Sequence, residues 1–288
     1  RPQPSGCHET EPRSPMSAAA PAPHPSPAEA TAPLLLRRDA DGVAWLTLNR
    51  PAARNALSIG LMEALDAELQ AIGQDAAIRV VVIGGAGPAF CAGHDLREMR
   101  ADPTRAAYER VFALCSRVMQ RIVRLPKPVI ARVHGVATAA GCQLVASADL
   151  AVAAETARFA TPGVNIGLFC STPMVALSRA VPRKQAMEML LTGDLVDAAR
   201  AREIGLVNRV VPEPDLDAAV AALAAQIAGK SPLTLAIGKE AFYRQAELGL
   251  SDAYDHAAEV MTRNMLARDA AEGIDAFLQK RAPVWSGT

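Results

Sequence analysis

The chain alternates short strand-like runs with longer amphipathic stretches. Residues 43–50 (VAWLTLNR) alternate apolar and polar positions like a strand, and Pro51 ends the run. Residues 58–75 place apolar side chains on one helical face and acidic or amide side chains largely opposite. Residues 78–87 read as a buried strand that leads into a glycine turn. Strand, helix and strand in this order predict an α/β fold.

The same order recurs in the middle of the chain. Residues 127–135 (KPVIARVHG) are typical of a strand, and 149–154 (DLAVAA) of another. Between them, residues 137–150 (ATAAGCQLVASADL) begin with small residues and continue as a helix. The repeat therefore indicates a core built from strand and helix units.

From Asp215 onward the apolar periodicity is helical. The predicted helical segments are 215–229, 233–249, 252–267 and 269–280. We therefore predict three parts, a disordered leader over residues 1–33, a core over 34–214 and a helical C-terminal region over 215–288. Such a region either caps the core or packs on a partner subunit.

The leader bears on the compartment. Residues 1–33 are rich in Pro, Ala and Ser and cannot offset the entropy cost of ordering. Glu9, Glu11 and Glu29 argue against a mitochondrial presequence, which is rich in Arg and poor in acids. We expect a cytoplasmic protein, with the mitochondrial matrix as the alternative.

Composition excludes several classes of function. Thirty basic and thirty acidic residues cancel, so no global field attracts nucleic acid or an anionic membrane. No apolar run approaches the roughly 20 residues that span a bilayer. The five cysteines form no CxxC pair, which argues for free thiols and against a metal site or disulfide scaffold. We expect no metal, no nucleic-acid partner and no integral membrane association.

A glycine-rich segment, GGAGPAF at residues 84–90, follows a strand as nucleotide-binding loops do. The dinucleotide pattern GxGxxG would need glycine in place of Phe90, and no Gly-Lys-Ser/Thr follows for a phosphate-binding loop. We therefore expect no bound nucleotide cofactor.

The stretch FCAGHDLREM at residues 90–99 carries titratable side chains. Asp95 followed three residues later by Glu98 is typical of a helix capping box. His94 can titrate near neutral pH, although a surface histidine or one with satisfied hydrogen bonds is commoner.

Cys142 lies at the start of a predicted helix, whose dipole favours a thiolate. A cysteine-dependent thioesterase is therefore one function to test, although a buried cysteine usually serves packing.

Five segments, in order along residues 34–288, resemble the crotonase superfamily, the enoyl-CoA hydratase/isomerase family. They are LNRPAARNALS, FCAGHDLREM, KPVIARVHGVATAAGCQLVASADLAVA, FATPGVNIGL and LTGDLVDAARAREIGLVNRVVP. The resemblance implies an α/β crotonase-type spiral of ββα repeats with a helical C-terminal trimerisation region, assembled as a homotrimer or hexamer. It also implies an acyl-CoA thioester as substrate or ligand, with a place in fatty-acid or acyl-CoA metabolism.

In this family two backbone N–H groups hold the thioester oxygen as it becomes an enolate, and the matching residues are Ala92 and Ala140. A small-residue turn into a helix N-terminus suits such a negative charge. Further residues are candidates for substrate binding, the last two toward the coenzyme of a neighbouring subunit. They are Arg54, His94, Asp95, Arg97, Phe277 and Lys280.

The chain departs from the family at the two glutamates that activate water and move its proton. Their places hold Gln143 and Gly163, neither of which transfers protons. Positioned proton transfer is worth roughly a hundred- to ten-thousandfold per group, so ordinary hydration should be very slow. Two functions remain open, an atypical lyase or isomerase that stabilises a thioester enolate, and a non-catalytic acyl-CoA sensor or structural subunit.

Overall fold

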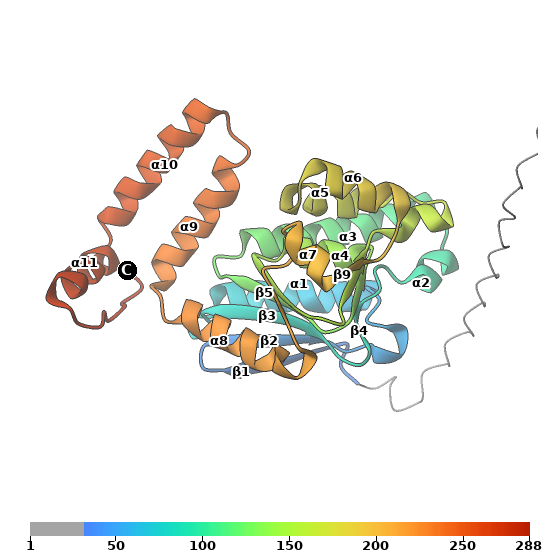
Figure 1. Ribbon diagram of the computed structural model, residues 1–288, viewed down its shortest axis with the longest axis horizontal. Coiled ribbons are helices and arrows are strands. Elements are labelled where there is room, and N and C mark those ends of the chain that lie inside the picture. Colours follow the sequence, from blue (N-terminus) through green and yellow to red (C-terminus); the bar gives the residue numbers. More distant parts are fainter. Residues whose placement is uncertain (1–31) are drawn as a thin grey trace, which may run out of the picture.

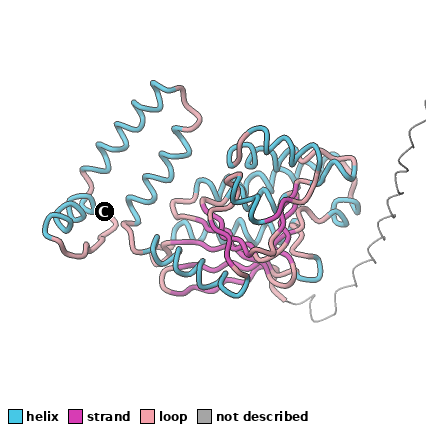
Figure 2. Tube along the Cα trace, in the orientation of Figure 1, coloured by secondary structure: helices cyan, strands magenta, loops and turns pink. Residues whose placement is uncertain are grey.

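The computed structural model describes residues 32–288, so the predicted leader over residues 1–33 lies almost wholly outside the described residues. In that part of the chain the strands form two sheets at the centre of the molecule (Figure 2). The larger sheet has the order β1 (Leu35–Ala40), β2 (Val43–Leu48), β3 (Val80–Gly85), β5 (Val129–Val133), β7 (Leu150–Ala154) and β10 (Arg209–Val211). The smaller sheet has the order β4 (Ala89–Cys91), β6 (Val136–Thr138), β8 (Arg158–Ala160) and β9 (Val196–Asp197). Neighbouring strands are parallel except in the pairs β1–β2 and β8–β9.

Successive strands pass from one sheet to the other. β3, β5 and β7 lie in the large sheet, and each is followed in the chain by a strand of the small sheet, β4, β6 and β8. Helices then return the chain to the large sheet. They are α2 (Leu96–Ala101), α3 (Arg105–Arg124), α4 (Ala140–Ser147), α5 (Ser171–Ala180), α6 (Arg183–Thr192) and α7 (Ala198–Glu203). The predicted spiral of ββα repeats is confirmed.

The large sheet is buried on both faces, as parallel strands connected through helices require. Val81 and Ile83 of β3 face the main core, which also contains the apolar face of α1 (Ile59–Gln74). Val80 and Val82 face the opposite way, onto α8 (Leu216–Ala228). Because α8 covers this face of the sheet, it belongs with the spiral, whereas the sequence assigned residues from 215 onward to the C-terminal region.

An arm of three helices follows α8 and projects away from the spiral, at the left of Figure 1. It consists of α9 (Pro232–Gln245), α10 (Leu250–Met265) and α11 (Arg268–Gln279). Within residues 32–288 no single helix is both long and apolar enough to cross a bilayer. Only the stretches Glu213–Ala228 and Pro232–Gln245 together, which meet at a 101° bend, reach that length and composition.

Candidate active site

Two turns meet at the N-terminus of α4, one after β4 and one after β6. A Cβ atom on Gly141 would lie 2.1 Å from the carbonyl oxygen of Cys91, so only glycine allows the turns to approach this closely. Gly93 has φ of +95°, and a Cβ there would lie 3.3 Å from the backbone nitrogen of Ala140. The hydroxyl of Thr138 donates to the carbonyl of Ala92 at 3.2 Å and ties the turns together.

Backbone pairing decides which N–H groups of the first turn are free. The N–H of Ala92 donates to the carbonyl of Arg54 at 3.0 Å. The predicted donor Ala92 is therefore wrong, because its N–H is already engaged. Leu57 forms a parallel bridge with His94 through the two residues that flank His94. The carbonyl of Leu57 accepts from the N–H of Asp95 at 3.2 Å, and the N–H of Leu57 donates to the carbonyl of Gly93 at 2.7 Å.

In such a bridge His94 itself makes no bond to Leu57, so its N–H points the other way. No acceptor for this N–H is found among residues 32–288. Nothing in the sequence distinguishes His94 from Ala92 as the donor, because the difference depends on the pairing with Leu57.

The second turn supplies a matching donor. Ala140 is the first residue of α4, and no acceptor for its N–H is found in the described part of the chain, as expected for the first turn of a helix. Ala139, which precedes it, has φ of +50° and ψ of −118°, a conformation that an L-residue adopts only under strain. Strain of this kind at a turn is characteristic of functional sites. The N–H of Ala140 thus fits its predicted role.

Gln143 lies one turn further along α4 and is 4% exposed. The thiol of Cys115, on α3, lies 3.8 Å from its Oε1 as a hydrogen-bond donor. Cys115 was not anticipated from the sequence, because the contact joins residues far apart in the chain. The Gln143 amide holds a fixed position but carries no transferable proton near neutral pH.

Gly163 lies in the 3-10 helix η2 (Pro162–Ile166) and is buried. A Cβ on Gly163 would lie 2.6 Å from the carbonyl oxygen of Leu168 and 2.9 Å from the Sγ of Cys170. The backbone of Leu168 is fixed here, since its N–H donates to the carbonyl of Gly163 at 2.9 Å. Neighbouring atoms therefore fill the space around Gly163, and any side chain at 163 requires the backbone to move.

The side chain of His94 is half-buried, and its Nε2 is buried without a partner among the described residues. Its ring packs edge-to-face on Phe112, with centroids 5.5 Å apart. Burial lowers the pKa of His94 to about 4, so the imidazole is neutral at physiological pH. The expectation of a satisfied or surface histidine is therefore wrong.

Asp95 and Glu98 both cap helices, but not as a reciprocal pair. Asp95 accepts from the N–H groups of Arg97 and Glu98 at the start of α2, as predicted. Glu98 instead accepts from the N–H of Ile59, at the start of α1, at 2.9 Å. Arg50 also pairs with Asp95 at 2.8 Å. Burial alone raises the pKa of Asp95, but these hydrogen bonds outweigh it and lower the pKa below its ordinary value.

The buried position of Cys142 contradicts the premise of a cysteine nucleophile. Its side chain is fully buried, and burial raises the pKa of its thiol to about 12. Desolvation outweighs the dipole of α4, which the sequence alone had favoured. All four cysteines in the described residues are buried free thiols.

The remaining substrate-binding candidates are exposed and lie in two separate places. Arg54 and Arg97 flank the first turn, and neither guanidinium has an ion-pair partner within residues 32–288. Phe277 is 82% exposed and Lys280 is also exposed, at the end of α11 in the arm. The structure thus gathers Ala92, His94, Asp95, Ala140 and Gln143 together, and leaves the α11 pair on a separate part of the chain (Figure 1).

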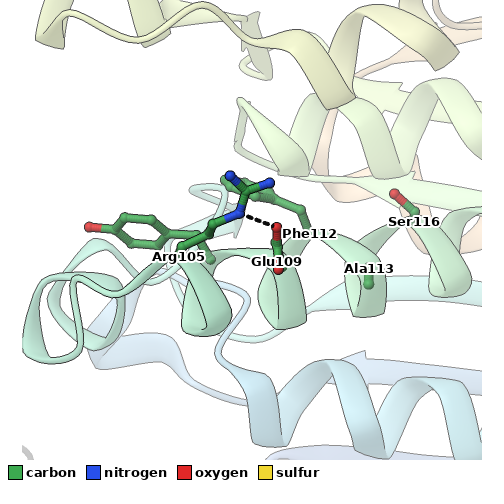
Figure 3. A pocket seen from close by; sticks show the side chains of 6 residues that line it. Arg105, Glu109, Phe112, Ala113 and Ser116 are labelled. Atoms are coloured by element: carbon green, nitrogen blue, oxygen red, sulfur yellow. Dashed lines mark hydrogen bonds and ion pairs between the residues drawn. The ribbon is translucent and has the colours of Figure 1, made fainter.

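A shallow, open groove of about 680 Å³ lies along α3, and its lining comes from this helix alone. Its lining consists of Arg105, Tyr108, Glu109, Phe112, Ala113 and Ser116. Figure 3 shows the ion pair between Arg105 and Glu109, whose atoms are 2.7 Å apart, near the Phe112 ring. Phe112 therefore joins the groove to His94, and one turn later Cys115 joins the same helix to Gln143.

Comparison with known proteins gives a consistent result. Residues 38–288 match the family model described as enoyl-CoA hydratase/isomerase. The chain is 45% identical, over 96% of its length and 93% of the relative's, to the mitochondrial enoyl-CoA hydratase domain-containing protein 3 of Rattus norvegicus. Two crystal structures are also similar. One is an enoyl-CoA hydratase of Mycobacterium smegmatis, with 55% identity and a TM-score of 0.86 over 88% of this chain and 99% of that chain. The other is human enoyl coenzyme A hydratase domain-containing protein 3, with 46% identity and a TM-score of 0.85 over 88% of this chain and 100% of that chain.

Proposed function

The chain belongs to the enoyl-CoA hydratase/isomerase family, and on that premise we propose that it binds acyl-CoA thioesters and stabilises their enolates. The N–H groups of His94 and Ala140 donate to the thioester oxygen. The observation that supports this most is the pair of N–H groups without acceptors on turns held together by Gly93 and Gly141. Preorganised donors of this kind supply on the order of a hundred- to a thousandfold in rate each.

The reaction proceeds without the glutamate pair of family hydratases. Gln143 holds a water or a polar substituent by hydrogen bonds, and position 163 contributes no side chain. Chemistry that needs two protein carboxylates is therefore slow here. The proposed reaction is enolate formation on a substrate that requires no strong protein base, within acyl-CoA or fatty-acid metabolism.

Exchange at the α-carbon tests the proposal directly. Saturated, 2-enoyl, 3-enoyl and 3-hydroxyacyl-CoA thioesters are incubated with the protein in heavy water, and deuterium and products are followed by mass spectrometry. We expect protein-dependent exchange or product in at least one class. Ala140→Pro removes one donor at the first position of α4, and it is combined with Ala139→Gly because the proline ring would clash with the Cβ of Ala139 in its observed conformation. The double variant should react about a hundredfold more slowly than Ala139→Gly alone, while circular dichroism confirms the fold.

A second function is favoured by the same site. A non-catalytic acyl-CoA sensor or structural subunit would keep both donors and dispense with proton transfer, as Gln143 and the closed position 163 permit. Acyl-CoA binding without exchange or product across the panel would establish this function in place of the first. Absence of both binding and turnover would overturn both proposals.

Exposed apolar side chains of the arm support assembly into a homotrimer or hexamer. Leu250, Tyr254, Leu266, Phe277 and Leu278 are each more than 70% exposed. Association of copies through this surface would bury them and carry Phe277 and Lys280 toward a neighbouring subunit's coenzyme. Sedimentation of the purified protein tests this, and a monomer at micromolar concentration would overturn it.

The compartment is also a proposal. The rat relative is described as mitochondrial, which supports the mitochondrial alternative and gives no support to the cytoplasm. We therefore propose mitochondria for this chain when it is made in a eukaryotic cell. A fluorescent fusion of the full chain should co-localise with a matrix marker, and the same fusion lacking residues 1–31 is the control.

A further inference from the structure

The imidazole of His94 is a polar group that the proposed enolate chemistry does not use. Its Nε2 is buried and has no hydrogen-bond partner within residues 32–288. A buried polar atom left without a partner costs about 1–3 kcal/mol. The same residue supplies a backbone N–H to the proposed site. The unpaired Nε2 therefore points to a polar group of the bound ligand as its hydrogen-bond partner.

The position of the ring limits which part of a ligand it meets. The backbone N–H of His94 faces away from Leu57 and is the proposed donor to the thioester oxygen. The side chain of the same residue lies against Phe112, which is 37% exposed and lines the groove along α3. An acyl chain that ran from the thioester oxygen to the groove would therefore pass this ring.

The chemistry of the ring favours a neutral oxygen as its partner. Burial keeps the imidazole uncharged, and a neutral imidazole offers one donor and one acceptor. A hydroxyl group can satisfy either nitrogen, and a keto oxygen can accept from a protonated one. Within residues 32–288 burial is the only influence on the charge of this ring, and the ring packs on the apolar Phe112.

We propose that His94 determines specificity by forming a hydrogen bond from its imidazole to an oxygen on the third carbon of the acyl chain. The ligand class is thus the 3-oxygenated acyl-CoA thioesters, reached when the Phe112 ring moves aside. This inference rests on the proposed function, since it needs a thioester held by the two backbone donors.

The test compares two ligands in one protein. Dissociation constants for 3-hydroxybutyryl-CoA and butyryl-CoA are measured by isothermal titration calorimetry. We expect the wild type to bind the hydroxylated thioester about fivefold more tightly, the worth of one net hydrogen bond. His94→Phe removes both ring nitrogens but keeps an aromatic ring against Phe112, and should bring the ratio close to one. His94→Gln keeps a donor and an acceptor and should retain most of the preference.

Controls separate the inference from the proposed function. His256→Phe is the matched control, because His256, on α10 in the arm, also has a buried Nε2 without a partner in the described chain. His256→Phe should leave the ratio of the two dissociation constants unchanged.

If His94→Phe fails to fold, His94→Leu gives the same comparison with a smaller side chain. An unchanged ratio in the folded apolar variant, or no preference in the wild type, overturns the inference alone. Failure of the wild type to bind either thioester overturns the proposed function with it.

Discussion

The ammonium group of Lys239, on α9, lies 2.6 Å from Oδ2 of Asp149, the residue just before β7. Lys239 also donates to the carbonyls of Ile122 and Lys127 at 2.9 and 3.0 Å, and its side chain is 8% exposed. The hydroxyl of Tyr243 donates to Oδ1 of Asp149 at 2.9 Å. This cluster fixes the first helix of the arm to the spiral by polar contacts, because α9 has no fully buried apolar side chain.

Replacing Lys239 by Met should detach the arm from the spiral. The substitution leaves the Asp149 carboxylate without its cation in a mostly buried place, and removing one partner of a buried pair typically costs about 3–5 kcal/mol. We expect about 3 kcal/mol of unfolding free energy to be lost, since Tyr243 and the N–H of Val129 still donate to Asp149.

Urea denaturation measures the loss. Lys230→Met is the matched control, because the side chain of Lys230 is exposed and has no partner in residues 32–288. Equal stability of the Lys239 and Lys230 variants would contradict this role.

Any side chain at Gly163 should destabilise the protein. The clash with the carbonyl of Leu168 involves backbone and cannot be relieved by rotating a side chain. Gly163→Ala should lower the unfolding free energy by about 2 kcal/mol or more. Gly163→Glu should do the same and should not restore hydration of crotonyl-CoA, even together with Gln143→Glu.

The control for this prediction is Gly238→Ala, in the interior of α9. A Cβ there meets nothing within 4 Å, so this change should stabilise the helix by roughly 0.5–1 kcal/mol. Rapid hydration by the Gly163→Glu variant would show that the segment after η2 rearranges readily.

The contrast between His94 and Asp95 illustrates how far the sequence predicts this site. Apolar periodicity located the helix α1 to within a residue at each end, and the motif order predicted the spiral and both turns. The role of Asp95 as a helix cap is a local property, so it was predictable as well. The sequence does not show which N–H group is free after β4, because this depends on the bridge between His94 and Leu57. It also does not show that a side chain at position 163 would clash with the carbonyl of Leu168. Both are tertiary contacts. The strand β1 and the helix α3 were not predicted, although the buried positions Val111, Leu114, Val118 and Ile122 of α3 follow the spacing of an amphipathic helix.

Ala139→Gly should stabilise the fold. Its φ of +50° and ψ of −118° cost an alanine about 1–3 kcal/mol, whereas glycine adopts this region freely. Glycine loses more chain entropy on folding, by roughly 0.5–1 kcal/mol, so a net gain of about 1 kcal/mol is expected. Thermal unfolding measures it, with Ala148→Gly, at an ordinary extended conformation after α4, as the destabilising control. A loss of stability in the Ala139 variant would mean that its methyl group makes contacts that outweigh the strain.

The C-terminal segment should be released in acid through Asp269, the second residue of α11. Burial by itself raises the pKa of Asp269, but hydrogen bonds from Ser231, Ser286 and the N–H of Gly287 outweigh it and lower the pKa to about 2. The ordinary value is 3.8. Because the folded state binds this proton less readily than the unfolded state, the contribution to stability is complete above about pH 4.

That contribution should therefore disappear as the pH falls from about 4 to 2, when the protonated carboxyl no longer accepts every hydrogen bond. Urea titrations at pH 7, 4, 3 and 2 on the wild type and Asp269→Asn should show the wild type more stable at pH 7, with the difference shrinking below pH 4. Asp275→Asn controls for general acid effects, because Asp275 is exposed on the same helix. A difference between wild type and Asp269→Asn that stays constant down to pH 2 would show that the contacts of Asp269 do not depend on its charge.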